Sequence, residues 1–106
     1  MSIPPLAALR AFEAVARHLS FTRAAEDLGM TQAAVSYQIR LLEDRLGTPL
    51  FLRKPRGIVL TETGALFARP TIDAFDMLRE TYSEPSADSV STLSISTVPT
   101  FAGVWL

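Results

Sequence analysis

The segment from Thr31 to Gly47 constrains the fold of this chain most, because it carries the signals of one helix from start to end. Thr31 can cap the start by accepting a hydrogen bond from a free backbone N–H. Gly47 suits the left-handed position that follows a helix, and Pro49 prevents continuation. Four apolar residues lie three or four positions apart on one face: Val35, Ile39, Leu42 and Leu46. This spacing predicts an amphipathic helix over residues 32–46.

The other face of this predicted helix carries short uncharged groups near its N-terminal end. Gln32, Ser36 and Arg40 lie four positions apart, and Ala33 and Tyr37 lie beside them. Amide and hydroxyl groups can hydrogen-bond base edges in the DNA major groove, which is about 12 Å wide and admits a helix. A core helix with a neutral outer face is the alternative, and this segment alone leaves both interpretations open.

Two helices are predicted upstream. The first starts after Pro4 and Pro5 and ends near His18, which we expect to face solvent. Its expected apolar face contains Leu9, Phe12, Ala16 and Leu19, and its expected polar face contains Arg10, Glu13 and Arg17. The second runs from a Ser20 cap to Gly29, and its expected buried residues are Phe21, Ala24, Ala25 and Leu28. A short helix, a glycine-containing turn and a longer helix are typical of a helix-turn-helix unit, although generic helical hairpins share this layout.

Two short runs of β-forming residues follow, from Leu50 to Arg53 and from Ile58 to Leu60. Proline and glycine turn the chain between them, and the turn is positively charged. The turn residues are Lys54, Pro55, Arg56 and Gly57. This pattern predicts a two-stranded wing that presents cations. An edge hairpin whose charges prevent aggregation is the alternative.

A long helix is predicted from a Thr61 cap to Tyr82, with a kink at Pro70. Its apolar stripe consists of Ala65, Ala68, Ile72, Phe75, Leu78 and Tyr82, with Phe67, Ala74 and Met77 alongside. The small preceding domain cannot cover so long a stripe, so the surplus predicts dimerisation with the same helix of a second copy. Packing against the first helix is the alternative, and both can occur together.

The composition and charge argue against several kinds of site. The chain has no cysteine and one histidine, so we expect no disulfide, metal site, cofactor or enzymatic activity. No apolar run approaches the roughly 20 residues that span a bilayer, and we expect a soluble, cytoplasmic protein without membrane contact. Residues 1–60 carry a net charge of +3 and residues 61–106 a net charge of −4. This asymmetry favours a basic module joined to an acidic one.

Several short motifs occur together, in order, between residues 4 and 82. They are Ser20-Phe21-Thr22 with Ala24-Ala25; Gln32, Val35-Ser36, Gln38-Ile39, Leu42-Glu43 and Leu46-Gly47; Leu50-Phe51 and Arg53; and Leu60-Thr61 with Gly64. In this combination the chain resembles the N-terminal part of LysR-type transcriptional regulators, in the branch of the glycine-cleavage and beta-lactamase regulators. Residues 93–106 resemble the first strand and helix start of the effector-binding domain of that family.

The resemblance implies a mainly α fold, a winged helix-turn-helix of three helices and a two-stranded wing, followed by a long dimerisation helix. It divides the chain into a DNA-binding domain (1–60), a linker helix (61–82), a hinge (83–92) and the start of a truncated effector-binding domain (93–106). We therefore expect the chain to be part of a longer protein. The implied partners are double-stranded DNA with an interrupted inverted repeat, a second copy of the chain (or a tetramer at full length) and a small-molecule effector.

The resemblance also assigns roles to residues. Base contacts fall at Gln32, Ala33 and Ser36, with Tyr37 next to them, and Arg56 falls where a wing cation enters the minor groove. Phosphate contacts are expected at Thr22, Arg23, Thr31, Arg40, Arg53 and Lys54. Many members of the family have arginine in place of Tyr37, which leaves the operator bases open. Tyr37 could contact a phosphate or a thymine methyl group instead.

The effector-binding loop of the family would include Thr97, Val98 and Thr100. Sequence-specific DNA binding by a homodimer is therefore the function that we expect from the sequence. A protein-interaction module that keeps the winged fold without binding DNA is the alternative.

Overall fold

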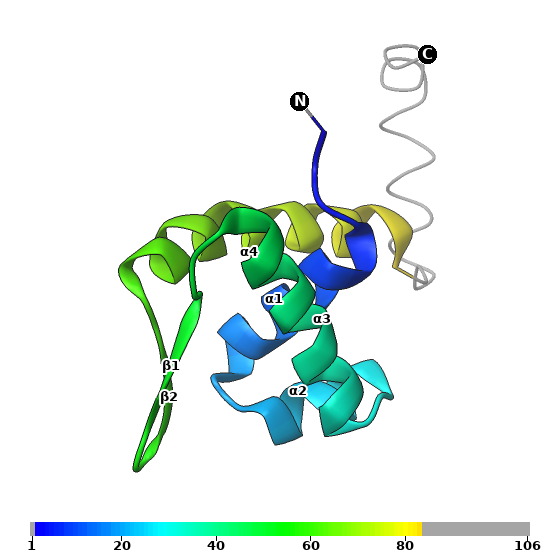
Figure 1. The fold of residues 1–106 in the computed structure, drawn as a ribbon. Helices are drawn as coiled ribbons and strands as arrows, with labels where there is room; N and C mark the ends of the chain where they lie inside the picture. The colour runs from blue at the N-terminus through cyan, green and yellow to red at the C-terminus, as the bar shows by residue number, and fades with distance from the viewer. Residues whose placement is uncertain (1, 84–106) are drawn as a thin grey trace, which may run out of the picture.

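The computed structural model describes residues 2–83, which form four helices and a two-stranded antiparallel sheet (Figure 1). The elements in chain order are α1 (Leu6–His18), α2 (Phe21–Leu28), α3 (Gln32–Leu46), β1 (Phe51–Lys54), β2 (Gly57–Leu60) and α4 (Glu62–Tyr82). The predicted winged helix-turn-helix with a long helix after it is confirmed. The expected hinge at 83–92 lies outside the described residues except for Ser83, and the expected domain start at 93–106 lies wholly outside them. Within residues 2–83, no helix combines the length and the apolar character needed to cross a membrane.

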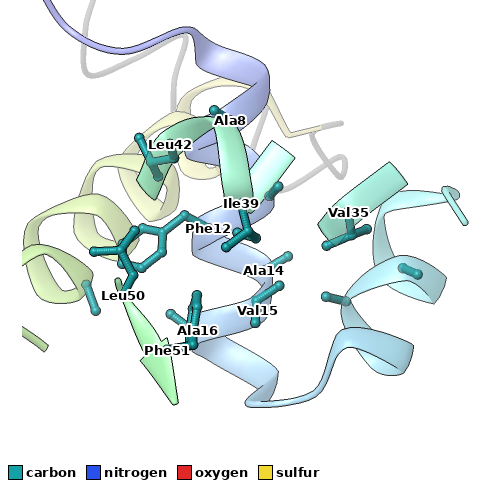
Figure 2. Close-up of a cluster of buried hydrophobic side chains, with 14 residues drawn as sticks. Ala8, Phe12, Ala14, Val15, Ala16, Val35, Ile39, Leu42, Leu50 and Phe51 are labelled. Atoms are coloured by element: carbon teal, nitrogen blue, oxygen red, sulfur yellow. The ribbon is translucent and has the colours of Figure 1, made fainter. Parts of the chain in front are cut away.

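Helix α1 lies at the centre of the fold, and α2, α3 and α4 all pack against it. Figure 2 shows the core that they share. Phe12 of α1 is fully buried, and its ring centroid lies 5.6 Å from that of Phe51. Three of the four apolar residues predicted for α3, Val35, Ile39 and Leu42, are buried in this core. A fully buried side chain of this size contributes about 1.5–3 kcal/mol, so the apolar stripe of α3 fixes which face of the helix remains outside.

The helix starts follow the predicted caps. The hydroxyl oxygens accept from backbone N–H groups as follows: Ser20 from Arg23 at 3.1 Å, Thr31 from Ala34 at 3.0 Å and Thr61 from Gly64 at 2.9 Å. Gly29 and Gly47 end α2 and α3 in the left-handed conformation, as expected. Because both ends of α3 are fixed by local interactions, its polar first turn has a defined position.

The structure corrects two expectations for the first helix. Leu19, expected on the apolar face, is 44% exposed, because it ends α1 in a left-handed conformation with φ 51° that turns it away from the core. Glu13, expected on the polar face, is 1% exposed. Leu46 of α3, expected in its apolar stripe, is also partly exposed, because it lies at the end of the helix.

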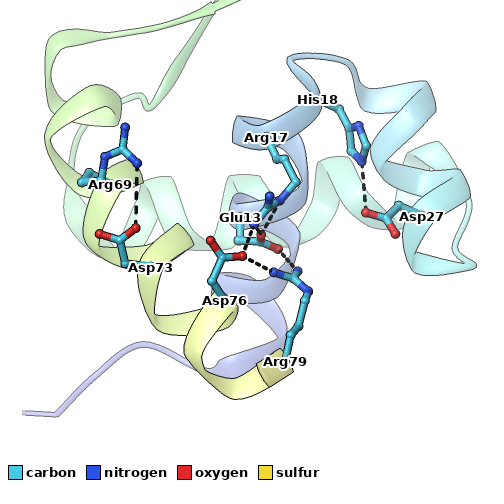
Figure 3. A network of polar contacts seen from close by, with 8 residues as sticks. All are labelled: Glu13, Arg17, His18, Asp27, Arg69, Asp73, Asp76 and Arg79. Atoms are coloured by element: carbon cyan, nitrogen blue, oxygen red, sulfur yellow. Dashed lines mark hydrogen bonds and ion pairs between the residues drawn. The ribbon is translucent and has the colours of Figure 1, made fainter. Parts of the chain in front are cut away.

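Glu13 is buried because two arginines pair with it, one from α1 and one from α4 (Figure 3). Arg17 Nε donates to Glu13 Oε2 at 2.8 Å, and Arg79 Nη2 donates to Glu13 Oε1 at 2.7 Å. Both arginines also donate to Asp76 Oδ1. The hydrogen bond to Glu13 is the main cause that raises the pKa of both guanidinium groups above its ordinary value; Asp76 adds a second hydrogen bond for Arg17 and its negative charge for Arg79. These four residues, the Glu13 cluster, join the two helices.

The wing is a short antiparallel ribbon with Phe51 opposite Leu60 and Lys54 opposite Gly57. Its base is held against the start of α4, where Gly64 is buried. A Cβ atom at position 64 would lie 2.1 Å from the carbonyl oxygen of Leu50, so only glycine permits this approach. The wing and α4 therefore meet through backbone contact.

Candidate nucleic-acid interface

The first turns of α3 present their polar residues on the outside of the domain. Gln32, Ala33 and Tyr37 are exposed, and Ser36 is half-buried. Gln32 Nε2 donates a hydrogen bond to Thr22 Oγ1 of α2 at 2.7 Å. The predicted base-contacting residues thus lie together on one accessible surface. The first of them, Gln32, is hydrogen-bonded to the neighbouring helix α2.

A hollow of about 140 Å³ lies between this surface and the first strand of the wing. Ser36 and Arg40 line it from α3, Arg53 lines it from β1, and Phe21 lines it from the start of α2. The Arg53 guanidinium carbon lies 5.0 Å from the centroid of the Phe21 ring, a distance at which cations and aromatic faces attract. Two expected phosphate contacts, Arg40 and Arg53, therefore border the same depression.

Glu43, the acidic residue that lines this hollow, positions the wing. Glu43 Oε2 accepts a hydrogen bond from the backbone N–H of Leu50 at 2.8 Å, just before β1 begins. This bond ties the chain entering the wing to α3. The orientation of the wing relative to α3 therefore depends on Glu43.

The remaining expected cations lie at the edges of this surface. Arg23 is exposed in the first turn of α2, and Lys54 and Arg56 are exposed in the turn of the wing. Figure 1 shows the wing turn and the N-terminal end of α3 on the same side of the molecule, with α4 on the opposite side. Thr31 is exposed as well, and its oxygen caps α3.

The five expected cations of this surface are Arg23, Arg40, Arg53, Lys54 and Arg56, and within residues 2–83 none of them forms an ion pair. Of the other five arginines, Arg17 and Arg79 pair with Glu13 and Arg69 pairs with Asp73 at 3.8 Å, whereas Arg10 and Arg45 form no ion pair within residues 2–83 either. Positive charge without a carboxylate partner on one side of a domain is the electrostatic pattern of a surface that meets phosphate.

The stripe predicted for dimerisation is divided in the structure. Ala68 and Phe75 are buried and Ile72 is half-buried against the domain itself. Ala65, Leu78 and Tyr82 are exposed, Tyr82 by 78%. The buried part follows the alternative of packing against the first helix. Further exposed apolar residues of α4 are Leu66 at 71%, Met77 at 67% and Phe67 at 39%.

The single histidine lies outside this surface. His18 Nε2 is 3.0 Å from Asp27 Oδ2, and this hydrogen bond lowers the pKa of the Asp27 carboxyl group. No group of three or more His, Asp or Glu side chains within residues 2–83 is arranged to hold a metal ion. The expected effector residues Thr97, Val98 and Thr100 lie outside the described part of the chain.

An exposed polar helix end, unpaired cations beside it and a charged wing on the same side define the class of winged helix-turn-helix proteins. The model of the family described as "Bacterial regulatory helix-turn-helix protein, lysR family" matches residues 6–65, and the chain belongs to this family.

The relatives agree with this assignment. The chain is 50% identical over 105 residues to the glycine cleavage system transcriptional activator of Escherichia coli K12, covering 98% of this chain and 34% of the relative. It is 54% identical over 104 residues to the transcriptional activator AmpR of Citrobacter koseri, covering 96% and 36%. The crystal structure of the BenM DNA-binding domain with catB site 1 DNA has a TM-score of 0.67 at 29% identity, covering 87% of this chain and 98% of that chain. The chain thus spans about a third of the length of these curated relatives.

Three features of the site were not predicted from the sequence: the Thr22–Gln32 bond, the stacking of Arg53 on Phe21 and the tie from Glu43 to the wing. Each joins residues from different elements. The sequence does carry a partial signal, because Phe21 and Thr22 directly follow the Ser20 cap and so had to lie in the first turn of α2. Which residue of α3 or β1 they meet depends on how these elements pack.

Proposed function

We propose that this chain is the DNA-binding part of a LysR-type transcriptional regulator, which binds an interrupted inverted repeat as a homodimer. The observation that carries the proposal is the exposed, uncharged polar surface at the start of α3, flanked by five unpaired cations. Membership of the family and the likeness to a domain solved with DNA support it. At full length, the protein responds to a small-molecule effector and works in the cytoplasm.

In this proposal the N-terminal half of α3 lies in the major groove. Gln32 reads a base edge through its amide, and Ala33, Ser36 and Tyr37 lie next to it. A bidentate contact between a glutamine amide and adenine contributes about 1–3 kcal/mol of discrimination. Tyr37 is 54% exposed and can reach a thymine methyl group or a phosphate.

The surrounding hydroxyls and cations hold the phosphates and fix the register without reading the sequence. These residues are Thr22, Arg23, Thr31, Arg40, Arg53 and Lys54. Arg56, in the turn of the wing, enters the adjacent minor groove. A narrow A·T-rich groove has enhanced negative potential, so Arg56 favours such sequences.

Two copies pair through α4. The surface that remains free on α4 after it packs on its own domain carries several large apolar side chains: Leu66, Phe67, Met77, Leu78 and Tyr82. Exposed apolar side chains on this scale are unfavourable in water unless a partner covers them. We therefore assign the dimer contact to this free face of α4, rather than to the buried Ala68 and Phe75.

The test is binding to an operator selected from random duplexes. Affinity should fall with salt at a log–log slope of about −0.9 for each phosphate neutralised. Arg56→Ala should weaken binding to an A·T-rich operator more than to a scrambled duplex, measured by fluorescence anisotropy at one salt concentration. Equal losses on both duplexes would make Arg56 a simple counter-charge.

Binding that ignores salt would contradict the proposal as a whole. The alternative, a protein-interaction module, predicts a dimer in sedimentation that does not bind DNA even at low salt. The unpaired cations beside α3 argue against this alternative, because a surface that only met protein would not need them.

A further inference from the structure

The hydrogen bond between Thr22 and Gln32 connects two residues to which the proposed function gives different tasks. Thr22, in the first turn of α2, is an expected phosphate contact, and Gln32, at the start of α3, is an expected base contact. Gln32 Nε2 donates to Thr22 Oγ1 at 2.7 Å, and both side chains are exposed. The bond is therefore made at the outer surface, where DNA would be bound, and not in the core.

The donor and acceptor counts show what this bond leaves available. A threonine hydroxyl has one donor hydrogen and two acceptor lone pairs, and an amide has two N–H donors and a carbonyl acceptor. When Thr22 accepts one N–H, its own hydrogen stays free to donate to a phosphate oxygen. Gln32 keeps its second N–H and its carbonyl, which match the N7 acceptor and the N6 amino donor of adenine.

The bond fixes the orientation of the amide once the hydrogen of the Thr22 hydroxyl is donated to a phosphate. A free glutamine side chain can turn over, exchanging its donor and its acceptor, and would then fit a different base. Turning Gln32 over would place its carbonyl oxygen where its N–H now meets Thr22. The hydroxyl could bind that oxygen only by donating its own hydrogen, and Thr22 could then no longer donate a hydrogen bond to the phosphate.

We propose that Thr22 is a specificity-determining positioning residue: its hydroxyl, held by a phosphate, fixes the orientation of the Gln32 amide so that α3 selects adenine at one position of each half-site. This inference rests on the proposed function, since it requires that Gln32 meets a base. It goes beyond a phosphate contact, because Thr22 then affects which base is preferred and not only how tightly DNA is bound.

The experiment compares the wild-type chain with Thr22→Val, Thr22→Ser and Gln32→Ala on the selected operator and on duplexes with each base pair of a half-site replaced in turn. The position where Gln32→Ala abolishes discrimination is the base pair that Gln32 reads. At that position, Thr22→Val should reduce discrimination about fivefold, the effect of one net hydrogen bond. Thr22→Ser, which keeps the hydroxyl, should retain it. The double variant Thr22→Val/Gln32→Ala should discriminate to the same extent as Gln32→Ala alone, because Thr22 acts on discrimination only through Gln32.

Two controls separate this effect from general weakening. Arg23→Gln removes the neighbouring cation of α2 and should weaken binding to every duplex by the same factor. Thr63→Val makes the same chemical change on α4, away from the surface, and should change neither affinity nor preference. Thr22→Ala, with a residue that favours helix, repeats the test if valine lowers the thermal stability measured by circular dichroism.

The outcomes are distinct. Equal weakening on all duplexes by both Thr22→Val and Thr22→Ala would make Thr22 a phosphate contact only and would overturn the inference, while leaving the proposed function intact. Unchanged discrimination in Gln32→Ala would remove Gln32 from the base-contacting set and the inference with it. A wild-type chain without any sequence preference would overturn the proposed function itself.

Discussion

The carboxylate of Asp27 shows how a single pair between two helices makes stability depend on pH. Its pKa is lowered by the hydrogen bond from His18 at the end of α1, and by the positive charges of His18, Arg10 and Arg79. Partial burial raises the pKa, but this effect is smaller than that of the hydrogen bond. A carboxyl group with a lower pKa in the folded state than in the unfolded state stabilises the fold when it is ionised.

The contribution of Asp27 is therefore complete above the ordinary pKa of an aspartate, about 3.9, and is lost as the pH falls through the lowered value. Asp27→Asn should reduce the melting temperature at pH 6, and the difference from the wild type should shrink as the pH is lowered toward 3. Melting curves at constant ionic strength measure this. A difference that stays constant over this range would mean that the charge of Asp27 does not matter.

Single residues with local roles were predictable, and residues defined by tertiary contacts were not. Ser20 and Thr31 were identified as caps because the groups that they satisfy lie within three positions in the sequence. Glu13 was misplaced because a carboxylate on a helix normally faces water, and its burial depends on Arg79, which lies 66 residues away. No periodicity contains that information.

At the scale of elements, the Glu13 cluster is the polar link between α1 and α4 (Figure 3). Glu13 is almost fully buried, while Arg17 and Arg79 retain side-chain exposures of 37% and 44%. Removing the charge of a buried partner is costly, because the remaining groups lose hydrogen bonds that water replaces poorly. The cluster therefore adds a polar link to the packing of α4 against α1.

Glu13→Gln should lower the free energy of unfolding by about 2 kcal/mol, or the melting temperature by roughly 10 °C. Urea denaturation at a fixed protein concentration measures the change. Arg69→Gln is the matched control, because the Arg69–Asp73 pair is exposed at both ends and should contribute less than about 0.5 kcal/mol. If both variants lose the same amount, the buried cluster has no special role.

Element positions were largely predictable, because caps, glycine stops and apolar spacing are all local signals. The strands of the wing were predicted within one residue at each boundary. The sequence did not predict which apolar residues of the α4 stripe pack against the domain and which remain exposed. Which of its apolar residues face the domain depends on the angle at which α4 crosses α1, and the angle is set by contacts distant in the sequence.

At the scale of the whole molecule, the two proposed surfaces lie on opposite sides: the polar end of α3 and the wing on one, and α4 on the other (Figure 1). Dimerisation through α4 can therefore occur without covering the DNA-binding surface. This arrangement makes the two activities separable by mutation.

Met77→Asp should place a charge in the dimer contact and weaken self-association by about 3 kcal/mol, roughly a hundredfold. Analytical ultracentrifugation measures the change, and the binding of single half-sites should persist. Ala65→Asp is the control on the same helix, since Ala65 is exposed but lies away from Met77 on the helix surface. Dissociation by Ala65→Asp with no effect of Met77→Asp would return the contact to the stripe first predicted.

The bare backbone contact at Gly64 has a mechanical consequence. Side chains can adopt new rotamers, but a helix resting on a carbonyl oxygen has no such freedom, so the ribbon and the long helix must tilt as one body. In the proposed dimer, any change in the distance between the two DNA-binding domains therefore has to come from sliding or rotation at the contact between the two α4 helices.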